Sequence, residues 1–171
     1  MNVLPASLLG LTLVMASLAS MPALARSSDR NQPMDIDAGH SDYSLDDSRP
    51  TVLSGGVIIT QGTLDIRSNV AVVHTANGEP VRAVLTGTPV KLTQELDDGK
   101  AMDAVANKVD YDLKGEVVVF TGKVTIEEPR GTLNGERVVY NMKTSQVTSG
   151  GEGAGRVKMR IQPKTPQKGG G

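Results

Sequence analysis

Residues 53–66 read Leu-Ser-Gly-Gly-Val-Ile-Ile-Thr-Gln-Gly-Thr-Leu-Asp-Ile, and residues 120–133 read Phe-Thr-Gly-Lys-Val-Thr-Ile-Glu-Glu-Pro-Arg-Gly-Thr-Leu. In both segments a Ser-Gly or Thr-Gly pair precedes apolar residues at every second position. The offset between them (120 minus 53) persists downstream, and upstream it grows by one residue. This repetition predicts two copies of one unit, approximately residues 34–74 and 102–141, joined by residues 75–100.

Outward from these segments, apolar residues recur with a period of two, which is typical of strands with one buried face. Pairs of turn-forming residues separate the runs. We therefore expect an all-β, antiparallel fold whose two copies cover each other's apolar faces as a sandwich, jelly roll or open solenoid. The short runs are Met34–Ala38, Val57–Thr60, Leu64–Arg67, Val90–Thr93, Val109–Leu113, Val124–Glu127 and Val157–Ile161. The predicted turns are Asp46-Asp47, Gly55-Gly56, Asn77-Gly78, Asp97-Asp98-Gly99, Lys114-Gly115 and Asn134-Gly135.

The first 25 residues carry no charged side chain and end in Ala23-Leu24-Ala25, which fits the small-x-small pattern of a signal peptidase site. The apolar block is shorter than the ~20 residues that a transmembrane helix needs. We expect residues 1–25 to be a cleaved signal peptide and residues 26–161 to form the exported β domain. The Pro-, Lys- and Gly-rich residues 162–171 are predicted to be a disordered basic tail.

The composition argues against several kinds of chemistry. The 171 residues include no Cys, which excludes disulfides, thiolate metal sites and a cysteine nucleophile. A net charge of -1 argues against a nucleic-acid partner. His40 and His74 have no metal-ligand or catalytic partner at a suitable spacing. We therefore expect no enzyme, no catalytic residue, no metal and no cofactor.

The predicted interior consists of Val, Ile, Leu and Met, with three Tyr and one Phe in the whole chain. Flexible or small aliphatic side chains could form an ordinary closed core, or they could accommodate acyl chains. A structural β-filament is a third possibility, and a polysaccharide-binding module would need a row of aromatic residues. The alternation by itself leaves these alternatives open.

Four segments resemble the LptA/OstA family of periplasmic lipopolysaccharide transport proteins. They are Gln32–Ala38, Gly55–Leu64, Ala106–Leu113 and Val119–Val124. The resemblance implies an open, twisted antiparallel β-jelly roll built from two OstA-like repeats. It also implies a periplasmic protein that stacks head to tail with copies of itself, with an LptC-like partner on the inner-membrane side and with an LptD-like partner on the outer-membrane side. The lipid A acyl chains of lipopolysaccharide would pass along the apolar interior.

Alternation predicts which side chains face inward, and the resemblance favours Ile36, Leu92, Tyr111 and Leu113 as lipid contacts. The complete predicted lipid-binding groove consists of Met34, Ile36, Val57, Ile59, Leu64, Ile66, Leu92, Val109, Tyr111, Leu113, Val124, Ile126 and Tyr140, and Val90 and Leu133 are also expected to face inward. Unpaired edge strands can extend a neighbour's sheet. The predicted partner edges are Met34, Ile36 and Ala38 at one end and Val157, Met159 and Ile161 at the other.

Overall fold

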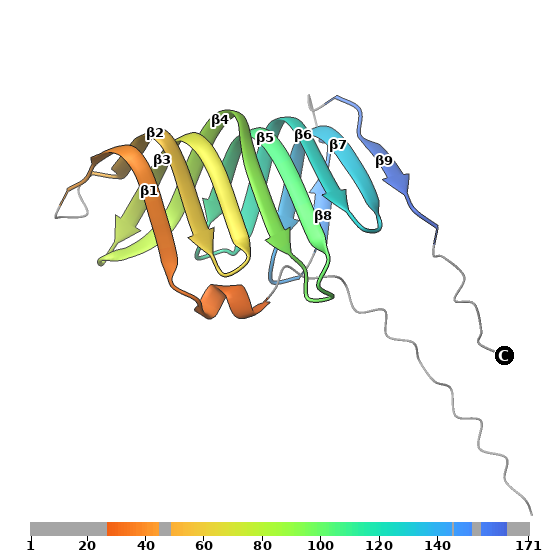
Figure 1. Ribbon diagram of the computed structural model, residues 1–171. Coiled ribbons are helices and arrows are strands. Elements are labelled where there is room, and N and C mark those ends of the chain that lie inside the picture. Colours follow the sequence, from red (N-terminus) through yellow and green to blue (C-terminus); the bar gives the residue numbers. More distant parts are fainter. Residues whose placement is uncertain (1–26, 45–48, 145, 152–154, 164–171) are drawn as a thin grey trace, which may run out of the picture.

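A computed structural model of the chain describes residues 27–44, 49–144, 146–151 and 155–163 (Figure 1). The predicted signal peptide and residues 164–171 of the predicted tail lie outside these residues. The described residues form a 3-10 helix and nine strands. The elements are η1 (Ser27–Asn31), β1 (Met34–Asp42), β2 (Thr51–Gln61), β3 (Leu64–Ala76), β4 (Glu79–Glu95), β5 (Ala101–Asp112), β6 (Val117–Glu128), β7 (Gly131–Asn141), β8 (Gln146–Ser149) and β9 (Lys158–Ile161).

All nine strands belong to one antiparallel sheet. Strands β1 to β8 pair in sequence order, and β9 pairs with β7 beside β8. The second edge of β7 is therefore shared: β8 covers residues 138–141 and β9 covers residues 131–134. In the described residues no ladder joins β1 to β8 or β9, so the sheet stays open rather than closing into a barrel. This confirms the expected all-β, open antiparallel fold.

A line of register shifts crosses the sheet and divides β1 to β7 into two parts. Bulges of this kind bend a strand and increase its twist. The strands curve at this line, so that one set of strand halves lies in front of the other (Figure 1). We call the two parts half-sheet A and half-sheet B. Half-sheet A contains residues 34–38, 57–61, 64–67, 90–95, 101–105, 124–128, 131–135 and β9, and half-sheet B contains residues 40–42, 51–54, 70–76, 79–86, 108–112, 117–121, 137–141 and β8.

Two of the predicted turns are wrong because their residues lie inside strands. Gly55 and Gly56 lie within β2, with φ of 81° and 86°, at the shift between Ser54 and Val57. A glycine with positive φ suits a bulge as well as a hairpin turn. Asn134 and Gly135 lie within β7, where they pair with β6. For the same reason β1 to β7 are longer than the predicted runs, at 9 to 17 residues.

The predicted turns at Asn77-Gly78, Asp97-Asp98-Gly99 and Lys114-Gly115 are confirmed, and Asp46-Asp47 lies outside the described residues. The two copies of the predicted repeat fall on β1 to β3 and on β5 to β7, with β4 between them. The bulge in β2 (54/57) and the bulge in β6 (121/124) stand at matching positions of the two copies.

Candidate functional site: the apolar interior and its two open ends

One row of apolar side chains crosses the whole of half-sheet A. Residues directly opposite each other in an antiparallel ladder lie on the same face, so the row can be followed from strand to strand. It runs Ile36, Ile59, Ile66, Leu92, Ala104, Ile126, Leu133 and Met159. We call it the interior row. Its central members are buried, whereas Ile36 and Met159 at its ends are 47% and 63% exposed.

Half-sheet B faces this row with two rows of its own. The row nearer the bend contains Leu53, Ala71, Leu85, Val109, Phe120 and Val138, all buried. The row farther from the bend contains Thr51, Val73, Ala83, Tyr111, Val118, Tyr140 and Val147. Buried residues of both half-sheets form one hydrophobic cluster. The middle of the interior is therefore packed with side chains, and its two ends are open.

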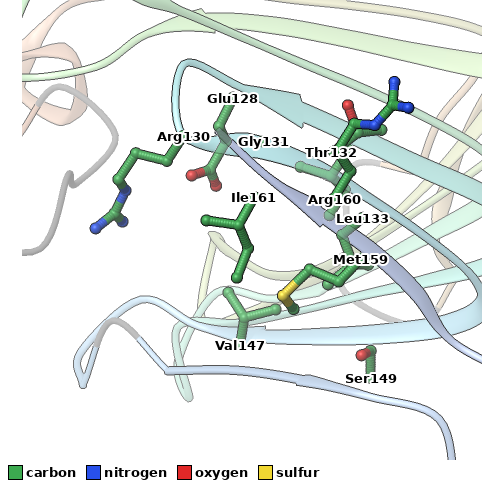
Figure 2. A pocket seen from close by; sticks show the side chains of 11 residues that line it. Glu128, Arg130, Gly131, Thr132, Leu133, Val147, Ser149, Met159, Arg160 and Ile161 are labelled. Atoms are coloured by element: carbon green, nitrogen blue, oxygen red, sulfur yellow. The ribbon is translucent and has the colours of Figure 1, made fainter. Parts of the chain in front are cut away.

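The C-terminal end of the interior contains a cavity of about 330 Å³ between β7 and β9 on one side and β8 on the other. Figure 2 shows Met159 and Ile161 of β9 and Val147 of β8 directed toward one another. Leu133 and Ile126 continue the apolar lining inward along the interior row. Three charged residues, Glu128, Arg130 and Arg160, also line the cavity.

The N-terminal end is formed by β1 and by η1, which is fixed by a buried carboxylate. Asp29 is 4% exposed, and its Oδ2 accepts hydrogen bonds from Thr63 Oγ1 (2.5 Å) and Gln94 Nε2 (3.2 Å). Thr63 in turn accepts a hydrogen bond from the backbone N–H of Glu95 (3.2 Å). A buried carboxylate with several donors holds its position because leaving it unpaired is costly. Asp29 therefore connects the segment before β1 to the β2–β3 turn and to β4. The sequence alone did not indicate this role.

Charged residues lie on the outer face of the sheet. Arg82 of β4 donates two hydrogen bonds to Asp110 of β5, at 2.8 and 2.6 Å. Lys108 Nζ lies 3.6 Å from Oδ2 of the same carboxylate. The hydrogen bonds from Arg82, and secondly its positive charge, lower the pKa of Asp110 below its ordinary value. These contacts link β4 to β5 on the outer face of the sheet.

The structure brings most of the predicted groove residues together. Val57, Ile59, Leu92, Val109, Val124 and Ile126 are buried in the cluster, and Leu64, Ile66, Tyr111 and Tyr140 pack against it. Met34 and Ile36 stand at the free edge of β1, and each keeps about half of its surface exposed (48% and 47%). Leu113 was expected in a strand, but β5 ends at Asp112 and Leu113 begins the β5–β6 turn, where its N–H bonds to the Val81 carbonyl (3.1 Å).

The predicted partner edges are both free in the described residues. β1 pairs only with β2, and β9 pairs only with β7. Met159 and Ile161 lie in β9, whereas Val157 precedes it by one residue. The sequence did not indicate β8, and it missed core positions such as Leu53, Leu85 and Val138, because their runs are interrupted by the bends.

The residues that the structure describes contain no cluster of metal-binding side chains. No group of three or more His, Asp or Glu side chains there lies close enough to hold a metal ion. No helix in that part of the chain is long and apolar enough to cross a membrane. The distinguishing features are an apolar interior, which runs the length of an open sheet, and two unpaired edges.

These features define a class: β-jelly-roll proteins whose sheet is left open around a continuous apolar interior. A family model described as LptA/(LptD N-terminal domain) LPS transport protein matches residues 35–146. The chain therefore belongs to the LptA/LptD N-terminal domain family of LPS transport proteins. This confirms the family that the sequence resembles.

Individual relatives agree over nearly the full chain. The lipopolysaccharide export system protein LptA of Haemophilus influenzae is 33% identical over 154 residues, covering 88% of this chain and 89% of the relative. LptA of Escherichia coli is 30% identical over 164 residues, covering 93% and 88%. The crystal structure of LptH, the LptA-homologous periplasmic component of the lipopolysaccharide transport device of Pseudomonas aeruginosa, is similar with a TM-score of 0.69 at 26% identity. That comparison covers 80% of this chain and 99% of LptH.

Proposed function

We propose that this protein carries lipopolysaccharide through the periplasm, with the lipid A acyl chains held in the interior between the two half-sheets. The observation that carries the proposal is the interior row, which continues without a polar interruption from Ile36 to Met159 and reaches both ends of the sheet. The names of the relatives, which are export and transport proteins for lipopolysaccharide, support it.

The physical basis is the cost of exposing acyl chains to water. Each CH₂ group removed from water contributes about 0.8 kcal/mol, so even partial shelter of several chains gives strong retention. A lining of aliphatic side chains offers no fixed polar anchor, so a chain can move along it. The half-sheets are connected through the bends and not by a ladder at the open side, so the interior can widen without breaking the hydrogen bonds between strands.

Within this proposal, the acyl chains contact the residues that line the interior and its ends. The described cavity at the C-terminal end provides space next to the interior row (about 330 Å³), and the aliphatic members deeper in the sheet would separate as a chain enters. The proposed contacts are Met34, Ile36, Ile59, Leu64, Ile66, Leu92, Tyr111, Ile126, Leu133, Tyr140 and Met159. The role is non-catalytic, and the energy for directed movement comes from another protein.

We further propose that the free edges join partners in the periplasm. An LptC-like partner would extend the sheet at β1, an LptD-like partner would extend it at the β8 and β9 end, and copies of this chain would stack between them. Residues 1–25 would serve as the export signal. Because the two edges differ, each contact joins two unlike surfaces and leaves one free edge at each end of the assembly. We therefore expect open-ended assemblies rather than closed twofold dimers.

Photo-crosslinking to purified lipopolysaccharide tests the carrier function. A photoreactive residue is introduced at Leu92, which is 9% exposed on the interior row, and separately at exposed Lys91, which points to the opposite face. A second matched pair is Leu133, which lines the cavity, and its exposed neighbour Asn134. We expect crosslinks at Leu92 and Leu133 and none at Lys91 and Asn134.

Crosslinks at none of the four positions, in folded protein that still assembles, would contradict the carrier function. That result would favour a structural filament with a closed core. Crosslinks at Lys91 and Asn134 instead would indicate binding on the outer face.

A further inference from the structure

The two free edges of half-sheet A have matching patterns. Residues 34–38 read Met-Asp-Ile-Asp-Ala, with apolar residues on the inner face and aspartates on the outer face. Residues 157–161 read Val-Lys-Met-Arg-Ile, with apolar residues on the inner face and basic residues on the outer face. The outer face of one edge segment is therefore acidic and that of the other is basic. In both segments the charged residues are the second and the fourth of the five.

The strand directions allow the two edges to pair. β1 and β7 run the same way, because six antiparallel steps separate them, and β9 is antiparallel to β7. A β1 strand from a second copy placed beside β9 therefore continues the antiparallel order of the sheet. The joint would be a ladder of the same kind as those inside the chain.

We propose that copies of this chain join with Met159 of one copy directly opposite Ile36 of the next, a register that rests on the head-to-tail stacking in the proposed function. This register places Ile161 opposite Met34 and Val157 opposite Ala38 on the inner face. On the outer face it places Arg160 opposite Asp35 and Lys158 opposite Asp37. The interior row then passes from one copy into the next without a break, and two opposite-charge pairs cover the joint.

Across the ladders of the described residues, the charged side chains at the two edges face no residue of opposite charge. Along the ladders of half-sheet A, Asp35 faces Thr60, Asp37 faces Ile58, Arg160 faces Thr132 and Lys158 faces Asn134. No acid–base pair stands directly opposite anywhere in the outer rows of half-sheet A; Asp103 faces Glu127 and Arg67 faces Lys91. Opposite charges directly across a ladder stabilise it, and like charges weaken it. The complementary edges are therefore explained by a partner strand rather than by the fold of one chain.

Other registers fit less well. A shift by one residue would turn the apolar side chains to the outer face. A shift by two residues in one direction leaves Lys158 opposite Gly39 and keeps one charge pair, Arg160 with Asp37. The opposite shift places Arg160 across from Pro33, which has no N–H for the ladder, and Ile161 across from Gln32.

Charge reversal tests the pairing in the mature full-length chain. One variant carries Asp35→Lys and Asp37→Lys, so that both of its edges are basic. The other carries Lys158→Asp and Arg160→Asp, so that both of its edges are acidic. By analytical ultracentrifugation we expect each variant alone to self-associate roughly 10- to 100-fold more weakly than wild type. Mixed in equal amounts, the two should assemble as alternating copies, because each edge then meets an edge of opposite charge.

Cysteine crosslinking tests the register, and the absence of native Cys makes it unambiguous. A chain with Ile36→Cys and Met159→Cys should form disulfide-linked multimers, because facing positions bring the Cα atoms within about 4.5–5.5 Å. The matched control carries Met34→Cys and Met159→Cys, which keeps both cysteines on the inner face but shifts them by two residues. We expect little crosslinking in the control.

The proposal is overturned if the mixed charge variants assemble no better than either one alone, if the control crosslinks instead of the facing pair, or if wild type does not self-associate. Circular dichroism confirms that the variants are folded. Lipopolysaccharide crosslinking at Leu92 in the dissociated charge variants reports on carriage separately. Retained crosslinking with a failed charge test rejects this register only, whereas a working joint without any crosslink at Leu92 rejects carriage only.

Discussion

The two ends of the sheet complete the same interior in different ways. At the N-terminal end a single strand, β1, runs through both half-sheets, and the buried Asp29 fixes the helix that precedes it. At the C-terminal end the edge is divided between β8 and β9, and a cavity opens between them. The first end carries Asp35 and Asp37, and the second carries Lys158 and Arg160.

This difference teaches how an open sheet can control its assembly. Free edges with similar sequences would pair indiscriminately, which is a common cause of aggregation. Edges that are matched in apolar pattern but opposite in charge favour head-to-tail contact over head-to-head or tail-to-tail contact. The two ends are therefore complementary rather than equivalent, and substitutions can separate what each contributes.

The largest expected effect compares the middle of the interior row with its N-terminal end. Ile126→Asn places an amide in the buried cluster and should lower the free energy of unfolding by about 4 kcal/mol. Ile36→Asn changes an exposed member of the same row and should cost less than about 1 kcal/mol. Urea denaturation followed by circular dichroism measures both. Equal losses would show that β1 packs as tightly as the centre of the sheet.

A smaller effect should be confined to the N-terminal end. Asp29→Ala leaves Thr63 and Gln94 without their carboxylate acceptor and should cost about 2 kcal/mol. Hydrogen exchange should accelerate in η1 and the start of β1 but not in β9. Asp29→Asn, which keeps one side-chain oxygen acceptor, is the control and should cost less. Faster exchange at β9 would indicate that the two ends are coupled through the sheet.

Substitutions at the two glycines of the bend in β2 distinguish a steric effect from a conformational effect. A Cβ on Gly55 would stand 3.1 Å from Gly39 Cα, whereas a Cβ on Gly56 would meet nothing within 4 Å. Both residues have positive φ, so each Ala substitution should cost about 1 kcal/mol from strain. Gly55→Ala should cost more because it also pushes against β1. Thermal unfolding of the two variants checks this order, and equal melting temperatures would contradict the close approach of β1 to β2.

The smallest effect concerns the outer face midway between the ends. The lowered pKa of Asp110 means that its pairing stabilises the fold above the ordinary pKa near 4, and that this contribution disappears as the pH falls through the lower folded value. Arg82→Ala should therefore lower the melting temperature only slightly at pH 7, because Arg82 is exposed, and by less at a pH low enough to protonate Asp110 in the folded protein. Melting temperatures at the two pH values measure the difference. A loss that is independent of pH would assign the effect to packing of the Arg82 stem.

Several parts of the site could be predicted from the sequence because they depend on local alternation. The period of two identified the strands and the inward positions such as Val57, Leu92 and Ile126, and the near-constant offset predicted two repeated units. The edge patterns at residues 34–38 and 157–161 were also readable. The family resemblance added the open jelly roll and the lipid, which periodicity alone left among several alternatives.

Other parts were decided only by pairing between distant strands. A glycine with positive φ suits a hairpin turn and a bulge alike, so the sequence placed a turn at Gly55-Gly56, where the structure has a bend within β2. It also placed a turn at Asn134-Gly135, which lies within β7 and pairs with β6. The role of Asp29 depends on Thr63 and Gln94, which are remote in the chain. Ile36 and Met159 lie in one row because each of the seven ladders between them has the required register. Alternation determines which face a side chain takes, but the register, and with it the continuity of the interior, is set by contacts that only the folded sheet makes.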